Sequence, residues 1–271
     1  MSITTFDDYV NAAFNRPQAF FAFPQATVPA LTGTQISWWT SSGYAGGGIV
    51  PPTGGGEAVS NTTQGSLSIQ APTGGRTLYL GPTAFTPTNS SAYFIHDRMV
   101  HTSGLDATLP TSQPVNTVAL PARAGTGVGI LAALEVYSLT GASAVTATVT
   151  YTNSSGIPGR TSVVSFQGNL TTRFMPISLA AGDVGVQSVQ SVQLSGSTGG
   201  AGNFGVTLFK PLVAIPSGGN STTIAQQSVF DQGTPAISSN SAIFFTSQST
   251  VAHVLTAWSI SFVEGLWILL L

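Results

Sequence analysis

The sequence predicts an all-β protein, an antiparallel β-sandwich or jelly-roll-like domain preceded by an extended N-terminal arm. Three observations predict this fold class. About ten short segments of apolar character are separated by turn signals, several of them alternate between apolar and polar residues, and only one segment has helical spacing. No segment recurs at a fixed period, which argues against a propeller or a β-helix.

Residues 1–56 are predicted to form the arm. A short helix is expected at 4–14, because threonines can cap it and Asp7 and Asp8 suit its positive end. A Gly/Pro-rich linker follows at 43–56. The aromatic residues between the helix and the linker are the predicted docking anchors: Phe20, Phe21, Phe23, Trp38 and Trp39. The alternative is that residues 1–56 as a whole form the first strands and loops of the main domain.

Residues 57–271 are predicted to form the sandwich. Alternation in segment 144–152 places valines and Tyr151 on one face and threonines on the other, which is typical of a half-buried strand. Segment 128–136 is nearly all apolar, which predicts a central strand covered on both faces. In segment 184–194, strict alternation places Gln190 on the same face as Val186, Val192 and Leu194. The predicted strands are 65–70, 76–80, 92–100, 128–138, 144–152, 161–167, 172–179, 184–194, 203–214, 242–248 and 254–263.

Two connecting or terminal segments carry further expectations. Residues 153–160 predict a hairpin loop, with glycines where the backbone needs a positive φ. The final residues are strongly apolar and are too few to span a membrane. They are either a continuation of the last core strand or a docking tail that inserts into a neighbouring subunit through Trp267, Ile268 and Leu271.

Composition excludes several classes of function. Only 6% of the 271 residues are charged, with seven Lys or Arg against nine Asp or Glu. Six scattered arginines and one lysine cannot supply the basic surface that nucleic acid requires. The chain has no cysteine, which excludes disulfides and thiolate metal sites. The first residues lack the basic and apolar regions of a signal peptide, so we expect neither secretion nor a membrane anchor.

The densest group of ionisable residues is at 96–101. Strict strand alternation would place His96 and His101 on opposite faces, and Asp97 and His101 about 13 Å apart on one face, too far for one metal ion. We therefore expect Asp97 and Arg98 to end a strand and to pair locally or across a subunit boundary. No nucleophile elbow or dinucleotide-binding glycine motif is present. The sequence predicts no catalytic residues, no metal and no cofactor.

Several loop-and-strand motifs then occur in a particular order between residues 92 and 215. They are Asp97–Leu105, Leu120–Arg123 leading into Leu134–Tyr137, Tyr151–Gly156 through Gly159–Thr161, and Leu179–Val189. In order and spacing these motifs resemble a group of small virion structural proteins encoded by tailed bacteriophages. The resemblance implies a non-enzymatic, β-rich component of the particle. Decoration proteins of this type are often trimers on the capsid lattice, and the resemblance implies a trimer here.

The residues and the resemblance together predict a virion structural protein assembled in the host cytoplasm. Its partners would be further copies of itself and the major capsid protein or other virion proteins, and its role would be capsid decoration or cementing. Near-zero net charge favours such association. One alternative is a tail, collar or head–tail connecting protein. Others are a carbohydrate- or host-receptor-binding module that uses Trp38, Trp39 or Tyr44, and a hydrolase acting on surface polymer.

Overall fold

The structure is a computed structural model, and it confirms the all-β prediction. All of the regular structure in the described residues is β-strand, except a single 3-10 turn at Ala122–Ala124 (η2). Within these residues no helix has the length and apolar character needed to cross a membrane. The described residues are 18–22, 33–41, 47–67, 69, 71–72, 77–87, 91–115, 118–217, 236–249 and 255–265.

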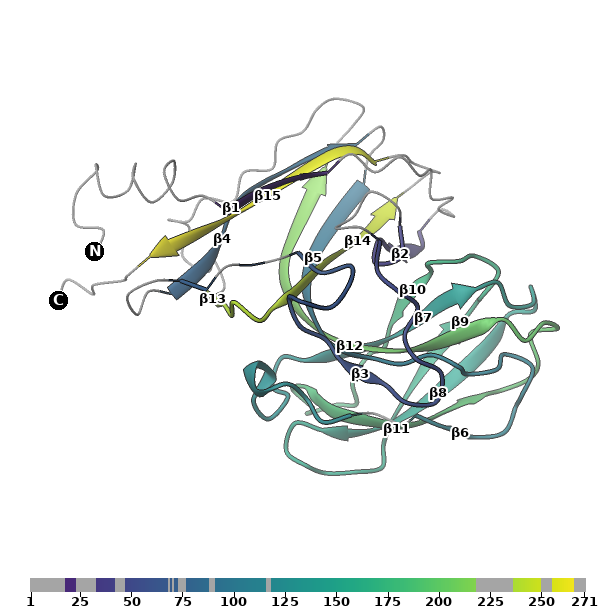
Figure 1. Cartoon of the computed structure of the whole chain (residues 1–271). Helices are drawn as coiled ribbons and strands as arrows, with labels where there is room; N and C mark the ends of the chain where they lie inside the picture. The colour runs from purple at the N-terminus through teal and green to yellow at the C-terminus, as the bar shows by residue number, and fades with distance from the viewer. Residues whose placement is uncertain are drawn as a thin grey trace.

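A seven-stranded antiparallel sheet, here called the central sheet, organises the molecule (Figure 1). Its strand order is β10–β7–β12–β5–β14–β2, with β3 also paired to β5. Its ends nearly meet, because Ile36 bridges to Arg173 and the Ser37 N–H donates to the Thr172 carbonyl at 2.7 Å. The sheet is therefore barrel-like, with an enclosed interior. Its strands are β2 (Gln35–Ser37), β3 (Glu57–Ala58), β5 (Ser91–His101), β7 (Leu131–Ser138), β10 (Phe174–Pro176), β12 (Asn203–Ser217) and β14 (Ala242–Ser249).

A second antiparallel sheet, the outer sheet, packs against one outside face of the central sheet. Its order is β6–β11–β8–β9. Apolar residues of the two sheets, such as Val149 and Val192 from the outer sheet and Leu134 and Val206 from the central sheet, share one buried cluster. This pair of sheets is the predicted sandwich. The strands are β6 (Gln113–Pro114), β8 (Val145–Asn153), β9 (Arg160–Phe166) and β11 (Val186–Leu194).

The third sheet, the terminal sheet, lies on the other side of the central sheet from the outer sheet (Figure 1). Its order is β1–β15–β4–β13. Leu78 and Leu80 of β4 pack into a second buried cluster with Tyr93 and Ile95 of β5. The chain therefore has two cores, one on each side of the central sheet. The strands are β1 (Gln18–Ala22), β4 (Thr77–Pro87), β13 (Ala236–Ile237) and β15 (Leu255–Gly265).

Most of the predicted strands are confirmed, and β8 and β7 bury the faces expected of them. In β8 the residues Ala147, Val149 and Tyr151 are buried. In β7 the residues from 132 to 136 are all buried, as a strand covered on both faces requires. The β8–β9 loop is the predicted hairpin, with φ of +78° at Gly156 and +72° at Gly159. The prediction for 65–70 is wrong, since its described residues lie outside any strand.

The predicted parity of β11 is also wrong. Val186, Val189, Val192 and Leu194 are buried, whereas Gln190 is exposed. Two register shifts against β8, between 186 and 188 and between 189 and 191, interrupt the alternation. A β-bulge places an extra residue on one strand, so the apolar residues of β11 recur at intervals of three before strict alternation resumes.

The described parts of residues 1–56 are built into the sheets. β1 pairs with β15, and β2 pairs with β14. The following tryptophans, Trp38 and Trp39, belong to the core cluster beside the terminal sheet. These parts fit the alternative interpretation, in which the segment supplies the first strands of the main domain. The helix predicted at 4–14 lies outside the described residues.

Candidate functional site

A bulge in β5 brings its ionisable residues together. Val100 lies opposite Leu208 of β12 and Arg98 lies opposite Phe209, so Met99 has no partner in the ladder. The extra residue shifts the alternation by one. Arg98 and His101, which strict alternation would separate, therefore share a face, and Arg98 Nε donates to His101 Nδ1 at 3.0 Å.

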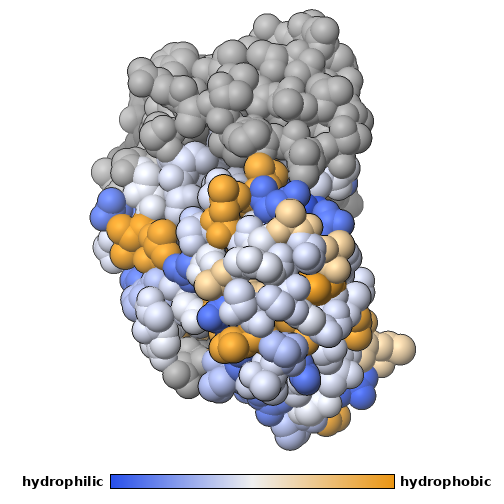
Figure 2. Space-filling model, turned by 90° about the vertical axis from the view of Figure 1, so that its right-hand side faces the viewer, coloured by the Kyte–Doolittle hydropathy of each residue, from blue (hydrophilic) through white to orange (hydrophobic). Residues whose placement is uncertain are grey.

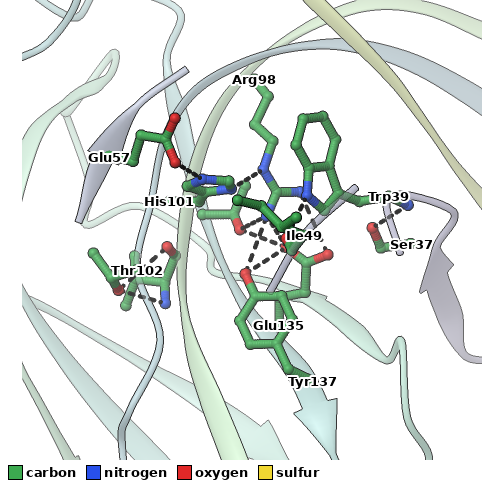
Figure 3. Close-up of polar contacts among 11 residues, drawn as sticks. Ser37, Trp39, Ile49, Glu57, Arg98, His101, Thr102, Glu135 and Tyr137 are labelled. Carbon is green, nitrogen blue, oxygen red and sulfur yellow. Dashed lines mark hydrogen bonds and ion pairs between the residues drawn. The ribbon is translucent and has the colours of Figure 1, made fainter. Parts of the chain in front are cut away.

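Arg98 occupies the interior of the central sheet. Its guanidinium forms an ion pair with Glu135 of β7, in which Nη2 lies 2.6 Å from Oε2, and the two side chains are 0% and 2% exposed. The guanidinium also lies 4.5 Å from the centre of the Trp39 ring and 5.1 Å from that of Phe244 in β14. Arg98 therefore contacts residues of strands on both sides of β5 in the central sheet. Figure 3 shows the guanidinium between His101, Trp39 and Glu135.

Two hydroxyl groups also form hydrogen bonds to the Arg98–Glu135 ion pair. Thr207 Oγ1 donates to Glu135 Oε2 at 2.5 Å, and Tyr137 OH donates to the same oxygen at 3.1 Å. Burial alone would raise the pKa of Glu135, but the charge and hydrogen bonds of Arg98 outweigh it and the pKa is lowered. Burial raises the pKa of Tyr137, and the charge of Glu135 adds to this. Both shifts favour an ionised Glu135 and a protonated Tyr137 hydroxyl at neutral pH.

His101 connects this interior pair to the edge of the sheet. Because Arg98 Nε can only donate, His101 Nδ1 must accept and its proton sits on Nε2, which donates to Glu57 Oε2 at 3.3 Å. Burial and then the charge of Arg98 lower the pKa of His101 to about 2. The ring is neutral and both nitrogens are engaged, so His101 has no free nitrogen with which to accept a proton from a substrate.

The second described histidine is enclosed by aromatic rings. His96 lies 5.1 Å from Phe244 and 4.8 Å from Phe209, measured between ring centres. Its Nε2 contacts Thr246 Oγ1 at 2.8 Å. Burial lowers the pKa of His96 to about 3. A hydroxyl beside an imidazole is the minimal arrangement for an activated nucleophile, but this pair is sealed inside the sheet, where no substrate can reach it.

On β5 the neighbouring Asp97 pairs with Arg123 of η2, in which Nε lies 3.1 Å from Oδ2. Arg123 Nη2 also donates to the carbonyls of Val59 and Arg98 at 2.7 Å each. Asp97 and Arg98 thus both form ion pairs within the chain, but with residues 26 and 37 positions away and not with local partners as expected. They also do not end the strand, because β5 continues to His101.

A second cluster, here called the Asp183 cluster, ties together loops at one end of the outer sheet. Asp183 accepts hydrogen bonds from Tyr151 OH at 2.6 Å, from Asn153 Nδ2 at 2.7 Å and from Arg160 Nε at 2.9 Å. Tyr151 OH in turn accepts from the backbone N–H of Ala180 at 2.8 Å. These hydrogen bonds to its carboxylate lower the pKa of Asp183 to about 2. The cluster holds the β8–β9 hairpin against the segment that leads into β11.

Together these clusters account for most of the charged side chains that the structure describes. The three described arginine–carboxylate ion pairs, and the hydrogen bond from neutral His101 to Glu57, are all internal to the chain. Among the same residues, no three His, Asp or Glu side chains come together as a metal site would need. The arrangement holds strands and loops in place. The loop-and-strand motifs noted in the sequence between residues 92 and 215 supply its members: Asp97, Arg98, Arg123, Glu135, Tyr151, Arg160 and Asp183.

The structure changes the interpretation of the predicted docking anchors. Trp38 and Trp39 are 2% and 0% exposed; Trp38 Nε1 donates to Ser247 Oγ, and Trp39 Nε1 donates to the Ile49 carbonyl. They are core residues in this chain, so their prediction as docking anchors is wrong. Phe20 and Phe21 lie in β1, paired with Ile260 and Ser259 of β15. The other anchors, Phe23, Trp267, Ile268 and Leu271, lie outside the described residues.

Sequence reasoning did not single out the apolar side chains that are exposed. Val163 on β9 is 62% exposed, and Val184, Val128, Leu139 and Ile157 are each more than half exposed. Figure 2 shows one face, on which apolar groups stand apart from one another in a largely polar surface. In the sequence these residues look like ordinary strand or loop residues, so only their exposure identifies them.

Comparisons with known proteins add little. No family model matches the chain, and no curated protein matches it. Among solved structures it has a weak similarity to VP2 of infectious bursal disease virus in a subviral particle, at 14% identity over 93% of this chain and 42% of that one, with a TM-score of 0.18. A structure of the Gt strain of the same virus is 12% identical over 92% of this chain and 42% of that one, with a TM-score of 0.15. The chain spans about two fifths of those chains, and TM-scores this low carry no argument about fold or function.

Proposed function

We propose that the protein is a non-enzymatic structural component of a tailed-bacteriophage particle, and within that class a capsid decoration or cement protein. The observation that supports the proposal is that the few charged side chains described are mostly paired with one another inside the chain. The described ion pairs all stabilise the chain itself, and the motifs that resemble virion proteins build them. What is left for partners is a polar, charge-poor surface with isolated exposed apolar side chains.

Such a surface suits an assembly subunit. It carries little charge that must be desolvated when a neighbour packs against it, and desolvating polar groups that end up imperfectly paired is a major cost of association. The subunit would bind further copies of itself and the major capsid protein through apolar and hydroxyl contacts. No cofactor or metal takes part in this function. The buried positions of Trp38 and Trp39 remove two of the three aromatic residues on which the sugar-binding alternative could rest. The third, Tyr44, lies outside the described residues.

Averaged electron microscopy of purified particles that carry this chain tests the proposal. Decoration predicts density for the three-sheet fold at repeated positions on the outer shell. Density at the tail, collar or head–tail junction would overturn decoration and retain a virion role. If mass spectrometry finds none of this chain in purified particles, the virion role itself is wrong.

A further inference from the structure

β9 is the edge strand of the outer sheet. On one side it pairs with β8 in an uninterrupted ladder from Tyr151–Arg160 to Val145–Phe166. On its other side no described residue forms a ladder with it. Within the described part of the chain, the outer backbone N–H and C=O groups of β9 thus face no strand, and a further strand could pair with them.

Apart from Arg160 at its first residue, this edge lacks the features that usually block strand addition. Protected edges carry lysine, proline or a bulge, or are very short. β9 has seven residues, none of them Lys or Pro, and its register with β8 has no shift. The opposite edge of the same sheet, β6, has only two residues, one of which is Pro114.

Apolar side chains on both faces of β9 are also left uncovered. Val163, on the outside face, is the most exposed of the large apolar side chains described, at 62%. Val164, on the inside face, packs against the sandwich core but is only partly buried. A strand added alongside β9 would cover both valines, which supplies a hydrophobic gain in addition to the backbone hydrogen bonds.

We propose that this edge binds the β9 edge of a second copy of the chain, antiparallel and related by a two-fold axis through Val163. The sequence of β9 is self-complementary in that register. Val163 lies opposite the partner's Val163, and Thr161 lies opposite the partner's Ser165, which gives one apolar pair flanked by hydroxyl pairs on the exposed face. A copy of the same strand provides this symmetric match, and two-fold contacts are the commonest between identical subunits.

Charge supports the same register. Arg160 is the only charged residue of β9, and the two-fold places the two copies of it at opposite ends of the paired strands, about 20 Å apart. Each Arg160 is already paired with Asp183 of its own chain. The contact therefore brings no like charges together, and it joins two outer sheets into one continuous sheet. It does not depend on the virion role.

Single cysteines test the contact, because the natural chain has none. Val163→Cys should form a disulfide-linked dimer under mild oxidation, since a residue on the axis faces its own copy. Val184→Cys is the matched control, because Val184 is a valine of nearly equal exposure, at 61%, in the loop before β11 and not on β9 itself. It should stay mostly uncrosslinked.

The register has its own test. Thr161→Cys alone and Ser165→Cys alone should not crosslink, whereas a mixture of the two variants should give a dimer containing one of each. Equal crosslinking of Val163→Cys and Val184→Cys would mean random collision and would overturn the proposal. A Val163→Cys chain that crosslinks only to a different protein in assembled particles would also overturn it.

A charge at the axis gives an independent measurement. Val163→Lys places two like charges opposite each other in the proposed dimer. At the same protein concentration, the molar mass measured by light scattering should therefore fall to half, from dimer to monomer, and the circular dichroism spectrum should be unchanged. Val184→Lys should leave the mass as in the natural chain. A natural chain that shows no self-association at concentrations where Val163→Lys is monomeric contradicts the proposal.

Discussion

Two arginine–carboxylate pairs hold different parts of this molecule, and they differ in their access to water. Arg98 and Glu135 lie inside the central sheet, 0% and 2% exposed. At the end of the outer sheet Asp183 is 4% exposed, but its partner Arg160 is 34% exposed. If its partner is lost, Arg160 can turn to solvent, whereas Arg98 cannot.

This difference assigns the two pairs different roles. A buried pair contributes little net stability over a well-packed apolar pair, but removing one partner leaves an uncompensated buried charge. Loss of either partner of the interior pair should therefore destabilise the central sheet strongly. The Asp183 cluster instead fixes where the hairpin and the loop before β11 lie, and its loss should be local.

The largest expected effect is at Glu135. Glu135→Gln keeps the shape of the side chain but leaves Arg98 without a counter-charge, so the free energy of unfolding should fall by about 3–5 kcal/mol. Urea unfolding at neutral pH measures this decrease in the free energy of unfolding. The double variant Arg98→Met with Glu135→Leu should recover most of the loss, because it removes both charges together.

Asp183→Asn is the matched substitution in the Asp183 cluster, and it should lower the free energy of unfolding clearly less than Glu135→Gln does. If Glu135→Gln costs no more than Asp183→Asn, the two pairs are equivalent and the comparison fails.

Acid should separate the two regions by pH. The folded-state pKa is about 3 for His96 and about 2 for His101, both below the unfolded value of 6.5. The unfolded chain therefore binds more protons, and stability should fall as pH drops below about 6.5, by about 1.4 kcal/mol per pH unit for each histidine. The pKa of Asp183 is about 2 against 3.8, so its contribution should persist until pH falls below about 4 and be lost towards pH 2.

Urea unfolding at a series of pH values tests this separation. His96→Phe should remove one histidine's share of the slope between pH 6 and 4, and Asp183→Asn should leave that slope unchanged. An identical slope in His96→Phe would show that His96 is protonated normally in the folded chain.

The parts of the fold that depend on local pattern could be predicted from the sequence. β8 alternates because one of its faces meets the core, and the glycines of its hairpin are required by positive φ. The bulge at Met99 could not be predicted, because it is defined by which residues of β12 lie opposite. That one residue decides that Arg98 and His101 share a face.

The candidate site depends on long-range contacts in the same way. Arg98 and Glu135 are 37 residues apart, and nothing in either segment specifies the other as its partner. The tryptophans illustrate a second limit. A pair of adjacent indole rings has the same sequence signature in a core as at an interface, and only the closure of the central sheet buries Trp38 and Trp39.

The smallest expected effect is at Tyr151, whose hydroxyl joins Asp183 to the backbone of Ala180. Tyr151→Phe keeps the buried ring and removes the hydroxyl, so the free energy of unfolding should fall by only about 1 kcal/mol. Hydrogen exchange should locate the change, with faster exchange at the Ala180 N–H and unchanged protection in β7 and β12. A loss as large as that of Glu135→Gln, or deprotection of the central sheet, would mean that the loops and the interior unfold as one unit.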